Sequence, residues 1–237
     1  MTENRAAFLP WLLWNIHKQD HPNRELVVVD GAAPLNTFPS RAPEADPEAE
    51  STVDGIVTRL VRTAAGTSVA AKRNLALAMA TGDVVAWFDD DDWHHPRRLS
   101  LLAGALAAGA EVAGSRHSWF LDPARHRASP HASSRGVVFN GLGARTGVAR
   151  ALRFDESRVR AADTPWVQQL SRAGAPTVLA EPLSMWLCHR HNLSNPVHRR
   201  SWPLDLAEVR RHVGARDWGD TDDHLRALRS RLAVAHC

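Results

Sequence analysis

The stretch that most limits what this chain can fold into runs from Gly82 to Trp93, where five apolar residues lead directly into four consecutive aspartates. An apolar run that begins at a glycine and ends in acids is typical of a short strand buried on both faces. Asp89 to Asp92 would then follow the carboxyl end of that strand. In open α/β sheets this is the edge where ligands bind.

Two interpretations of the four aspartates compete. Adjacent carboxylates repel one another, so the arrangement is costly unless a cation or hydrogen-bond donors lie beside it. The alternative is a solvated acidic turn that leads into the next helix, because aspartate also favours helix starts. A buried strand rarely ends in four acids, and this favours the ligand site over the solvated turn.

The balance of charges limits the partners. The chain has 237 residues, with 29 lysines and arginines against 26 aspartates and glutamates, and its formal net charge is +3. This balance does not indicate nucleic-acid binding, so no nucleic acid is expected as a partner. Cys188 and Cys237 form neither a disulfide framework nor a zinc pattern.

The apolar stretch from Phe8 to Trp14 is interrupted by Pro10 and is too short to span a membrane. It also lacks the basic start and the cleavage site of a signal peptide. We therefore expect no integral membrane segment and a cytoplasmic protein.

Apolar spacing predicts alternating helices and strands in the first half of the chain. Helices are expected over residues 8–19 and 70–81, and strands over 25–29, 56–61 and 84–88. The second helix is expected to bury the face formed by Ala71, Leu75, Ala78 and Met79. The proline-rich segment 32–52 predicts a loop or a lid.

The second half is more mixed. Pro96 fits the first position of a helix that buries Leu99, Leu102 and Leu106, and Thr164-Pro165 fits the cap and first position of another. Strands are expected at 112–113, 119–121, 137–139, 176–179 and 183–187, a loop at 122–135, and amphipathic helices over the last 35 residues. The alternation favours an α/β fold.

Several short motifs occur in an order that resembles one known family. They are Asn4-Arg5, Gln19 to Pro22, Glu25 to Asp30, Lys72 to Ala76, Ala80 to Asp83, Trp87 to Trp93 with Pro96 and Leu99, and Phe154 to Glu156 with Ala162, Asp163 and Trp166. Over residues 2–195 this set resembles the family 2 glycosyltransferases of the GT-A fold.

The resemblance implies one GT-A-like domain over residues 1–237, with an open mixed sheet flanked by helices. A nucleotide-sugar-binding half is expected over 1–115, an acceptor and catalytic half over 116–200, and a C-terminal helical extension over 201–237. The family's usual first strand has no counterpart before Thr2. We expect one of three explanations for that edge. The start codon is assigned too late and upstream residues form the strand, another element of the chain covers the edge, or a second copy (a homo-oligomer) or other partner covers it.

The resemblance also implies a metal-dependent hexosyltransferase that takes its sugar from a nucleotide-diphosphate sugar, with a UDP-sugar favoured. Asp91 is expected to hold Mn²⁺ or Mg²⁺, with His191 as a further ligand; a surface or packing role is the alternative for His191. The residues expected to contact the donor are Thr2, Arg5, Asp30, Lys72, Arg73, Asn74, Asp89 and Asp90. For Lys72 and Arg73 the alternative is a solvated helix face.

Other residues of these motifs have expected roles in catalysis or in the turn. Asp163 is the candidate general base for an inverting displacement, and its alternative is an ordinary helix-start residue. Asp92 is expected to orient the turn, while His94 and His95 are expected to shape it or to touch the acceptor.

Two rival functions remain open. A sugar-phosphate nucleotidyltransferase needs a glycine-rich phosphate loop with a nearby basic residue, which we do not find. A glycosyltransferase-like domain without turnover would act as a binding partner. The acceptor is undefined and is a small metabolite, a peptide or a glycan precursor.

Overall fold

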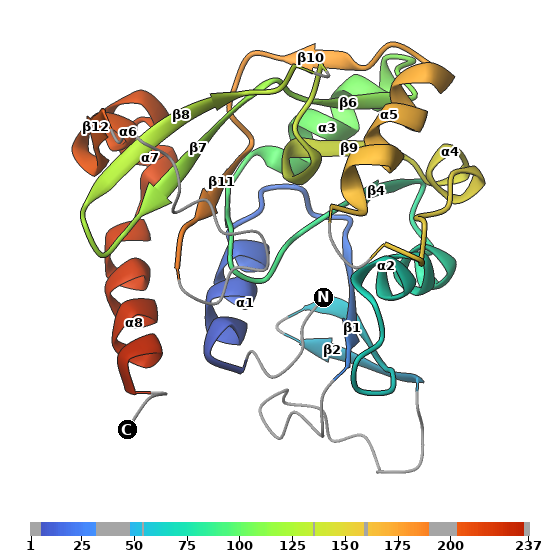
Figure 1. Cartoon of the computed structure of the whole chain (residues 1–237), viewed down its shortest axis with the longest axis horizontal. Coiled ribbons are helices and arrows are strands. Elements are labelled where there is room, and N and C mark those ends of the chain that lie inside the picture. Colours follow the sequence, from blue (N-terminus) through green and yellow to red (C-terminus); the bar gives the residue numbers. More distant parts are fainter. Residues whose placement is uncertain are drawn as a thin grey trace.

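Three β-sheets with helices around them make up the fold in the computed structural model (Figure 1). The structure describes residues 6–31, 48–53, 55–134, 136–158, 161–189 and 203–234. The predicted α/β class, with open sheets flanked by helices, is confirmed. The strands form three separate hydrogen-bonded ladders.

The first sheet has the strand order β1-β3-β2. Its strands are β1 (Glu25–Asp30), β3 (Ile56–Arg62) and β2 (Glu48–Val53). β1 and β3 are parallel, and β2 is antiparallel to β3. The loop or lid expected over residues 32–52 is therefore wrong for its last part, because the prolines stop at Pro47 and β-favouring Thr52 and Val53 follow.

The second sheet has the order β10-β6-β9-β4. Its strands are β10 (Thr177–Leu179), β6 (Val112–Ser115), β9 (Leu142–Arg145) and β4 (Val84–Ala86). β4 was expected to be buried on both faces over residues 84–88. It is instead a half-buried strand whose described ladder is with β9 alone, so its side chains are only partly covered.

The third sheet has the order β12-β8-β7-β11-β5. Its strands are β12 (Leu204–Asp205), β8 (Arg127–Ala132), β7 (His117–Asp122), β11 (Ser184–Leu187) and β5 (Trp93–His94). β7 and β11 are parallel, and the other pairs are antiparallel. β4 and β5, on either side of the acidic turn, thus belong to different sheets.

One loop prediction and one strand prediction in this region are wrong. Residues 127–132 form β8 rather than a loop; Pro130 is tolerated because β12 pairs with β8 only at Arg127 and Ala128. Residues 137–139 are not a strand, and η2 (Phe139–Gly141) begins there. Their apolar run is explained by burial in the core, which periodicity alone does not distinguish from a strand.

Helices cover these sheets in the first two thirds of the chain. They are η1 (Ala6–Phe8), α1 (Leu9–His17), α2 (Val69–Met79), α3 (Arg98–Ala107), α4 (Thr146–Ala151) and α5 (Asp163–Ala173). α3 begins after Pro96 and buries Arg98, Leu102 and Leu106, whereas Leu99 is half-buried. α5 begins at Asp163, so Thr164 lies inside it rather than at its cap.

The buried face of α2 is not the predicted one. The helix buries Ala70, Lys72, Arg73, Ala76 and Leu77. Ala78 of the predicted face is exposed. The apolar spacing gave the wrong face because Lys72 and Arg73, two long basic side chains, occupy buried positions. The Arg73 guanidinium lies 4.2 Å from the Phe139 ring centroid.

The C-terminal part is helical, as expected, with α6 (Leu206–Val213), α7 (Ala215–Trp218) and α8 (Thr221–Val234). Trp218, Leu225 and Leu228 join Phe8 and Trp11 in one hydrophobic cluster. Both ends of the described chain therefore close over the third sheet. None of the described helices has the length and apolar character needed to cross a bilayer.

Candidate active site

The four aspartates form a tight turn between β4 and β5. The Asp92 N–H donates to the carbonyl of Asp89 over 3.4 Å. Asp90, Asp91 and Asp92 are buried, with exposed fractions of 2%, 7% and 3%, and Asp89 is half-buried. This burial excludes the solvated acidic turn that the sequence left open.

Asp92 fastens the turn to the rest of the fold. Its carboxylate accepts hydrogen bonds from Asn140 Nδ2 at 2.8 Å and from the Leu187 N–H at 3.3 Å. Burial, together with the neighbouring Asp91 and Asp89 carboxylates, raises the pKa of Asp92 well above its usual value. Asp92 thus orients the turn against η2 and β11 through internal hydrogen bonds.

α1 holds the same turn from the other side. The Asp92 carbonyl accepts hydrogen bonds from Trp11 Nε1 at 2.8 Å and Asn15 Nδ2 at 3.3 Å. The side-chain Oδ1 of Asn15 accepts in turn from the His94 N–H at 2.9 Å. Because Asn15 is fully buried, these bonds are shielded from water and fix the backbone of the turn.

His94 and Arg98 form a buried relay to the first aspartate. Arg98 Nη1 lies 2.7 Å from His94 Nδ1, and His94 Nε2 lies 3.4 Å from the Asp89 carbonyl. Arginine only donates, so Nδ1 of His94 must accept and Nε2 must carry the proton. Burial, with the adjacent Arg98 charge, lowers the pKa of His94 well below its usual value, which agrees with a neutral ring.

Arg98 brings a positive charge under the acidic turn. Its side chain is fully buried, donates to the Leu142 carbonyl at 3.2 Å, and lies 4.4 Å from the Phe88 ring centroid. Burial lowers the pKa of Arg98 to about 9, while the Asp89 and Asp92 carboxylates act to raise it. The guanidinium therefore stays charged at neutral pH and offsets part of the carboxylate repulsion.

Asp91 faces a histidine from the far end of the chain. His189 Nε2 lies 3.1 Å from Asp91 Oδ2, and both side chains are 10% exposed. The Phe8 ring lies against His189 at a centroid distance of 4.7 Å. β11 delivers His189 just past its carboxyl end. His191, the predicted ligand, lies outside the described residues.

Of the predicted donor residues on α2, Lys72 and Arg73 are buried and Arg73 contacts the acidic turn, whereas Asn74 is half-buried. Arg73 Nη2 lies 3.6 Å from Asp89 Oδ1, and Lys72 is 3% exposed. The solvated helix face considered for these two residues is therefore wrong. Asn74 binds the main chain of Phe154, accepting from its N–H at 2.8 Å and donating to its carbonyl at 3.0 Å, so its amide links two segments.

The remaining predicted residues lie on other elements. Asp30 ends β1 and is 2% exposed. Asp163 is the half-buried first residue of α5. α5 packs against η2, and Asn140 of η2 binds Asp92, so Asp163 lies on an element one contact away from the turn. Thr2 and Arg5 lie outside the described residues.

Some residues of the site were not predicted from the sequence. Arg98, Asn15 and Asn140 carried no signal, because a single polar residue beside an apolar helix stripe looks like a surface position. Their burial, at exposed fractions of 0–1%, becomes visible only when the three sheets are assembled. For His189, its alternation with His191 at a strand end was the available signal.

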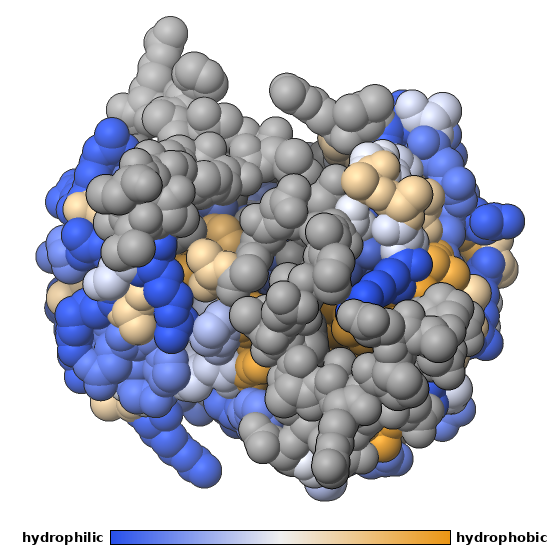
Figure 2. Space-filling view, turned by 90° about the horizontal axis from the view of Figure 1, so that it is seen from below, coloured by the Kyte–Doolittle hydropathy of each residue, from blue (hydrophilic) through white to orange (hydrophobic). Residues whose placement is uncertain are grey.

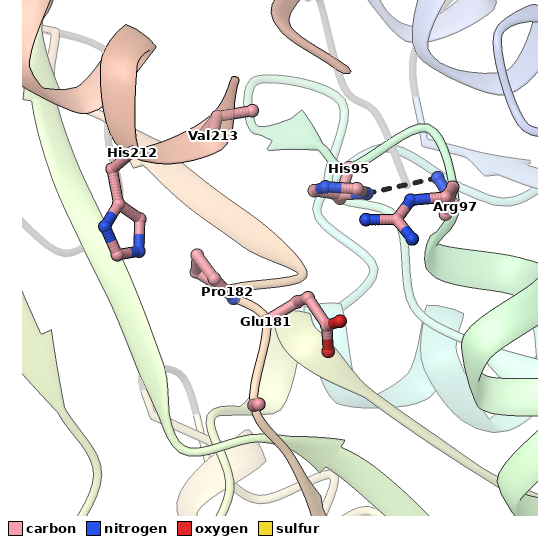
Figure 3. A pocket seen from close by; sticks show the side chains of 7 residues that line it. His95, Arg97, Glu181, Pro182, His212 and Val213 are labelled. Atoms are coloured by element: carbon pink, nitrogen blue, oxygen red, sulfur yellow. Dashed lines mark hydrogen bonds between the residues drawn. The ribbon is translucent and has the colours of Figure 1, made fainter. Parts of the chain in front are cut away.

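A small cavity of about 240 Å³ lies at the opposite edge of the third sheet (Figure 3). His95, Arg97 and Glu181 line it, and the Arg97 N–H donates to His95 Nδ1 at 3.1 Å. Burial lowers the pKa of His95, against the opposing effect of Asp217. Glu181 precedes β11 whereas His189 follows it, so this cavity is separate from the acidic turn.

Solved structures share this fold. The Staphylococcus aureus TarS fragment 1–349 in complex with UDP matches with a TM-score of 0.58 and 18% identity, over 78% of this chain and 58% of that one. The mannosyltransferase PcManGT from Pyrobaculum calidifontis, in complex with GDP-Man and Mn²⁺, matches with a TM-score of 0.55 and 17% identity, over 99% of this chain and 72% of that one. This chain thus spans little more than half of the TarS fragment.

These likenesses define the fold as that of the GT-A-type glycosyltransferases. Residues 1–156 match the family described as "Glycosyl transferase family 2", and the chain belongs to that family. No curated relative matches the chain.

Proposed function

We propose that this chain transfers a sugar from a nucleotide-diphosphate sugar to an acceptor hydroxyl, with inversion at the anomeric carbon. The observation that carries the proposal is the contact of Asp91 with His189 at 3.1 Å, where the acidic turn meets the carboxyl end of β11. A UDP-sugar is the favoured donor. The TarS structure with UDP supports this preference, whereas the PcManGT structure contains GDP-Man.

Asp91 and His189 are the proposed holders of a divalent cation, Mn²⁺ or Mg²⁺. Within the described ranges, no three His, Cys, Asp or Glu side chains are arranged to bind an ion. Two protein ligands fit a site that is completed by diphosphate oxygens and water, as is usual for such cations. The cation, when bound, neutralises charge on the diphosphate. His191 stays a predicted further ligand.

Asp163 is the proposed general base. Its carboxylate would take the proton of the acceptor hydroxyl as that oxygen bonds to the anomeric carbon from the side opposite the diphosphate. The bond between the anomeric carbon and the diphosphate breaks, and the nucleoside diphosphate leaves with the electron pair. A one-step displacement of this kind inverts the anomeric centre, as in inverting glycoside hydrolysis.

The donor contacts are proposed for residues around the same turn. Asp30 would accept from a base N–H, and Arg73 and Lys72 would meet phosphate or ribose. The contact of Arg73 with Asp89 supports the proposal that Arg73 and Asp89 both lie next to the bound donor. Thr2, Arg5, Asn74 and Asp90 remain predicted donor contacts.

Thermal unfolding with UDP, GDP or TDP, each with and without Mn²⁺, tests the proposal. A ligand at about 100 times its Kd stabilises by about 2.7 kcal/mol, which is a rise of several degrees for a chain of this size. We expect the rise with UDP only when Mn²⁺ is present. Asp91→Asn and His189→Ala should remove the Mn²⁺-dependent part, because each deletes one of the two ligands.

Asp83→Asn is the matched control, because Asp83 is an exposed aspartate just before β4. It should retain the full shift. The absence of a metal-dependent shift with any of the three nucleotides in the unmodified protein would contradict the proposal and favour a non-catalytic binding domain. Asp163→Asn should keep the shift and lose sugar transfer.

A further inference from the structure

A groove of about 400 Å³ lies between α6, α8 and the turn that joins β7 to β8. Pro123, Leu206 and Leu225 are among its apolar lining residues, and Leu225 is 4% exposed. Arg226 and Arg229 lie one helical turn apart on α8 and also line the groove. The groove thus combines an apolar wall with paired guanidinium groups.

The groove and the acidic turn share one edge of the third sheet. β7 and β11 are parallel neighbours, with Leu121 opposite Leu187. Pro123 follows the carboxyl end of β7, and His189 follows the carboxyl end of β11. The carboxyl ends of parallel strands meet at the same edge, and adjacent strands lie about 4.8 Å apart. Pro123 of the groove lining therefore lies at the same edge of the sheet as His189 of the proposed transfer site.

The charge of the groove is positive. Asp222 pairs with Arg210 at 3.3 Å, and Arg226 contacts Asp223. Among the described residues, no carboxylate lies within ion-pair distance of Arg229. Its Nη1 lies 3.2 Å from His126 Nε2, which must therefore accept. Three arginines line the groove against one aspartate.

His126 is held in the groove by its backbone. Its φ angle of 53° is in the left-handed region, which is uncommon for residues other than glycine. The Leu206 N–H donates to the His126 carbonyl at 3.3 Å. This conformation places the imidazole beside Arg229, and together they present nitrogen groups to the groove.

We propose that this groove binds a phosphate group that is carried on an apolar body, as part of the acceptor substrate. The inference rests on the proposed sugar transfer, whose acceptor class it narrows to phosphate-bearing molecules. Arg226 and Arg229 each offer a planar set of donors that matches phosphate oxygens. The apolar lining would cover the part of the acceptor next to the phosphate.

The charge pattern favours a single bound molecule over a membrane surface. α8 carries Asp222 and Asp223 in its first turn, and its leucines Leu225 and Leu228 are buried in the core, whereas a membrane-binding helix presents its apolar face to the lipid. In Figure 2 the left side of the molecule, where Figure 1 places α8, is largely hydrophilic.

Calorimetric titration with phenyl phosphate tests the groove, with UDP and Mn²⁺ present to fill the proposed donor site. We expect phenyl phosphate to bind the unmodified protein more tightly than phenol or inorganic phosphate, because it alone uses both the arginines and the apolar lining. The double variant Arg226→Gln and Arg229→Gln should weaken binding by about tenfold, through loss of charge-assisted hydrogen bonds.

The matched control is the double variant Arg116→Gln and Arg172→Gln, which removes the same charge from exposed arginines outside the groove. It should leave the affinity unchanged. Melting temperatures of all variants check the fold. His126→Gly is a second variant that should fold normally, because its positive φ suits glycine, and should also weaken phenyl phosphate binding.

Equal affinities in the groove variants and the control would overturn the proposal. So would binding to phosphatidylglycerol vesicles without binding to phenyl phosphate, which would indicate a membrane surface. The donor proposal has its own readout, the Mn²⁺-dependent shift with UDP. If the Mn²⁺-dependent shift is absent, sugar transfer and the acceptor role of the groove are both rejected. If phenyl phosphate binding is still weakened by the groove variants in that case, the groove is an anion-binding site without the acceptor role.

Discussion

The buried His94 side chain helps to hold the backbone of the acidic turn. His94 accepts from Arg98 on one ring nitrogen and directs the other toward the Asp89 carbonyl. A neutral ring with one donor and one acceptor meets both needs at once. The relay therefore positions the aspartates without occupying any of their carboxylate oxygens.

Replacing His94 tests this relay. His94→Phe leaves Arg98 Nη1 without its histidine acceptor and removes the side-chain donor to the Asp89 carbonyl, so we expect a loss of about 1–3 kcal/mol in unfolding free energy. Urea unfolding at pH 7 measures it. His94→Gln keeps a polar group near the Asp89 carbonyl and should lose less.

His117→Phe is the control, because His117 is exposed at the start of β7. Its unfolding free energy should change by no more than about 0.5 kcal/mol. A His94→Phe variant as stable as this control would show that the relay does not hold the turn.

At the residue scale, sequence reasoning identified the aspartates but not what surrounds them. Asp91 follows from the acidic run and the resemblance. The choice between His189 and His191 depends on the path of the chain after β11, which residue spacing does not define. Asn140 becomes significant only because a segment distant in sequence meets the turn.

Among the elements, β1 and the start of β4 are tied by one carboxylate. Glu25 accepts hydrogen bonds from the N–H groups of Thr81 and Gly82 at 2.6 and 2.8 Å, and it also contacts Arg59. Burial alone would raise the pKa of Glu25, but the hydrogen bonds from Thr81 and Gly82 and the Arg59 charge together lower it below its usual value. The charged form is therefore the one that stabilises the fold.

The lowered pKa of Glu25 makes the stability of the folded protein depend on pH. A carboxyl group with a lowered pKa in the folded state adds stability above its unfolded pKa, near 4.5, and loses it as the pH falls through the folded value. We expect Glu25→Gln to cost about 1–2 kcal/mol at pH 7. The difference from the unmodified protein should shrink as the pH falls well below 4.5. Urea unfolding across pH measures it.

Glu111→Gln is the control for this series, because Glu111 is an exposed side chain, 52% accessible, beside Arg145. Its effect should be small at every pH. A Glu25→Gln effect that is independent of pH would contradict the assigned role of the charged carboxylate.

The elements themselves were predictable where the apolar period was clean. β1, β3, α3 and the C-terminal helices carry strong patterns and lie close to their predicted ranges. β8 was missed because Pro130 and several basic residues hide a strand that is defined by its pairing with β7. The buried face of α2 was missed because Lys72 and Arg73 occupy core positions normally taken by apolar side chains.

Across the whole molecule, the two ends of the described chain share one core. Phe8 and Trp11 pack in the same cluster as Leu225 and Leu228 of α8. Phe8 also lies against His189. The C-terminal helices therefore support the segment that covers the proposed metal ligand.

Leu228→Ala tests this support. Leu228 is 2% exposed, and removing a buried leucine side chain costs about 2–5 kcal/mol. Its melting temperature should fall by several degrees, while Ser230→Ala, an exposed position on the same helix, should leave it unchanged. Equal melting temperatures would mean that α8 adds little to the core.

The acidic turn joins β4 of one sheet to β5 of another. A molecule that binds to the turn formed by residues 89–92 would therefore contact the junction between two separate sheets. Because such a ligand favours only the native arrangement, its binding free energy adds to the stability of the cooperative unit. Strands that never contact the ligand, such as β8 and β10, would then unfold less readily when a ligand is bound at the acidic turn.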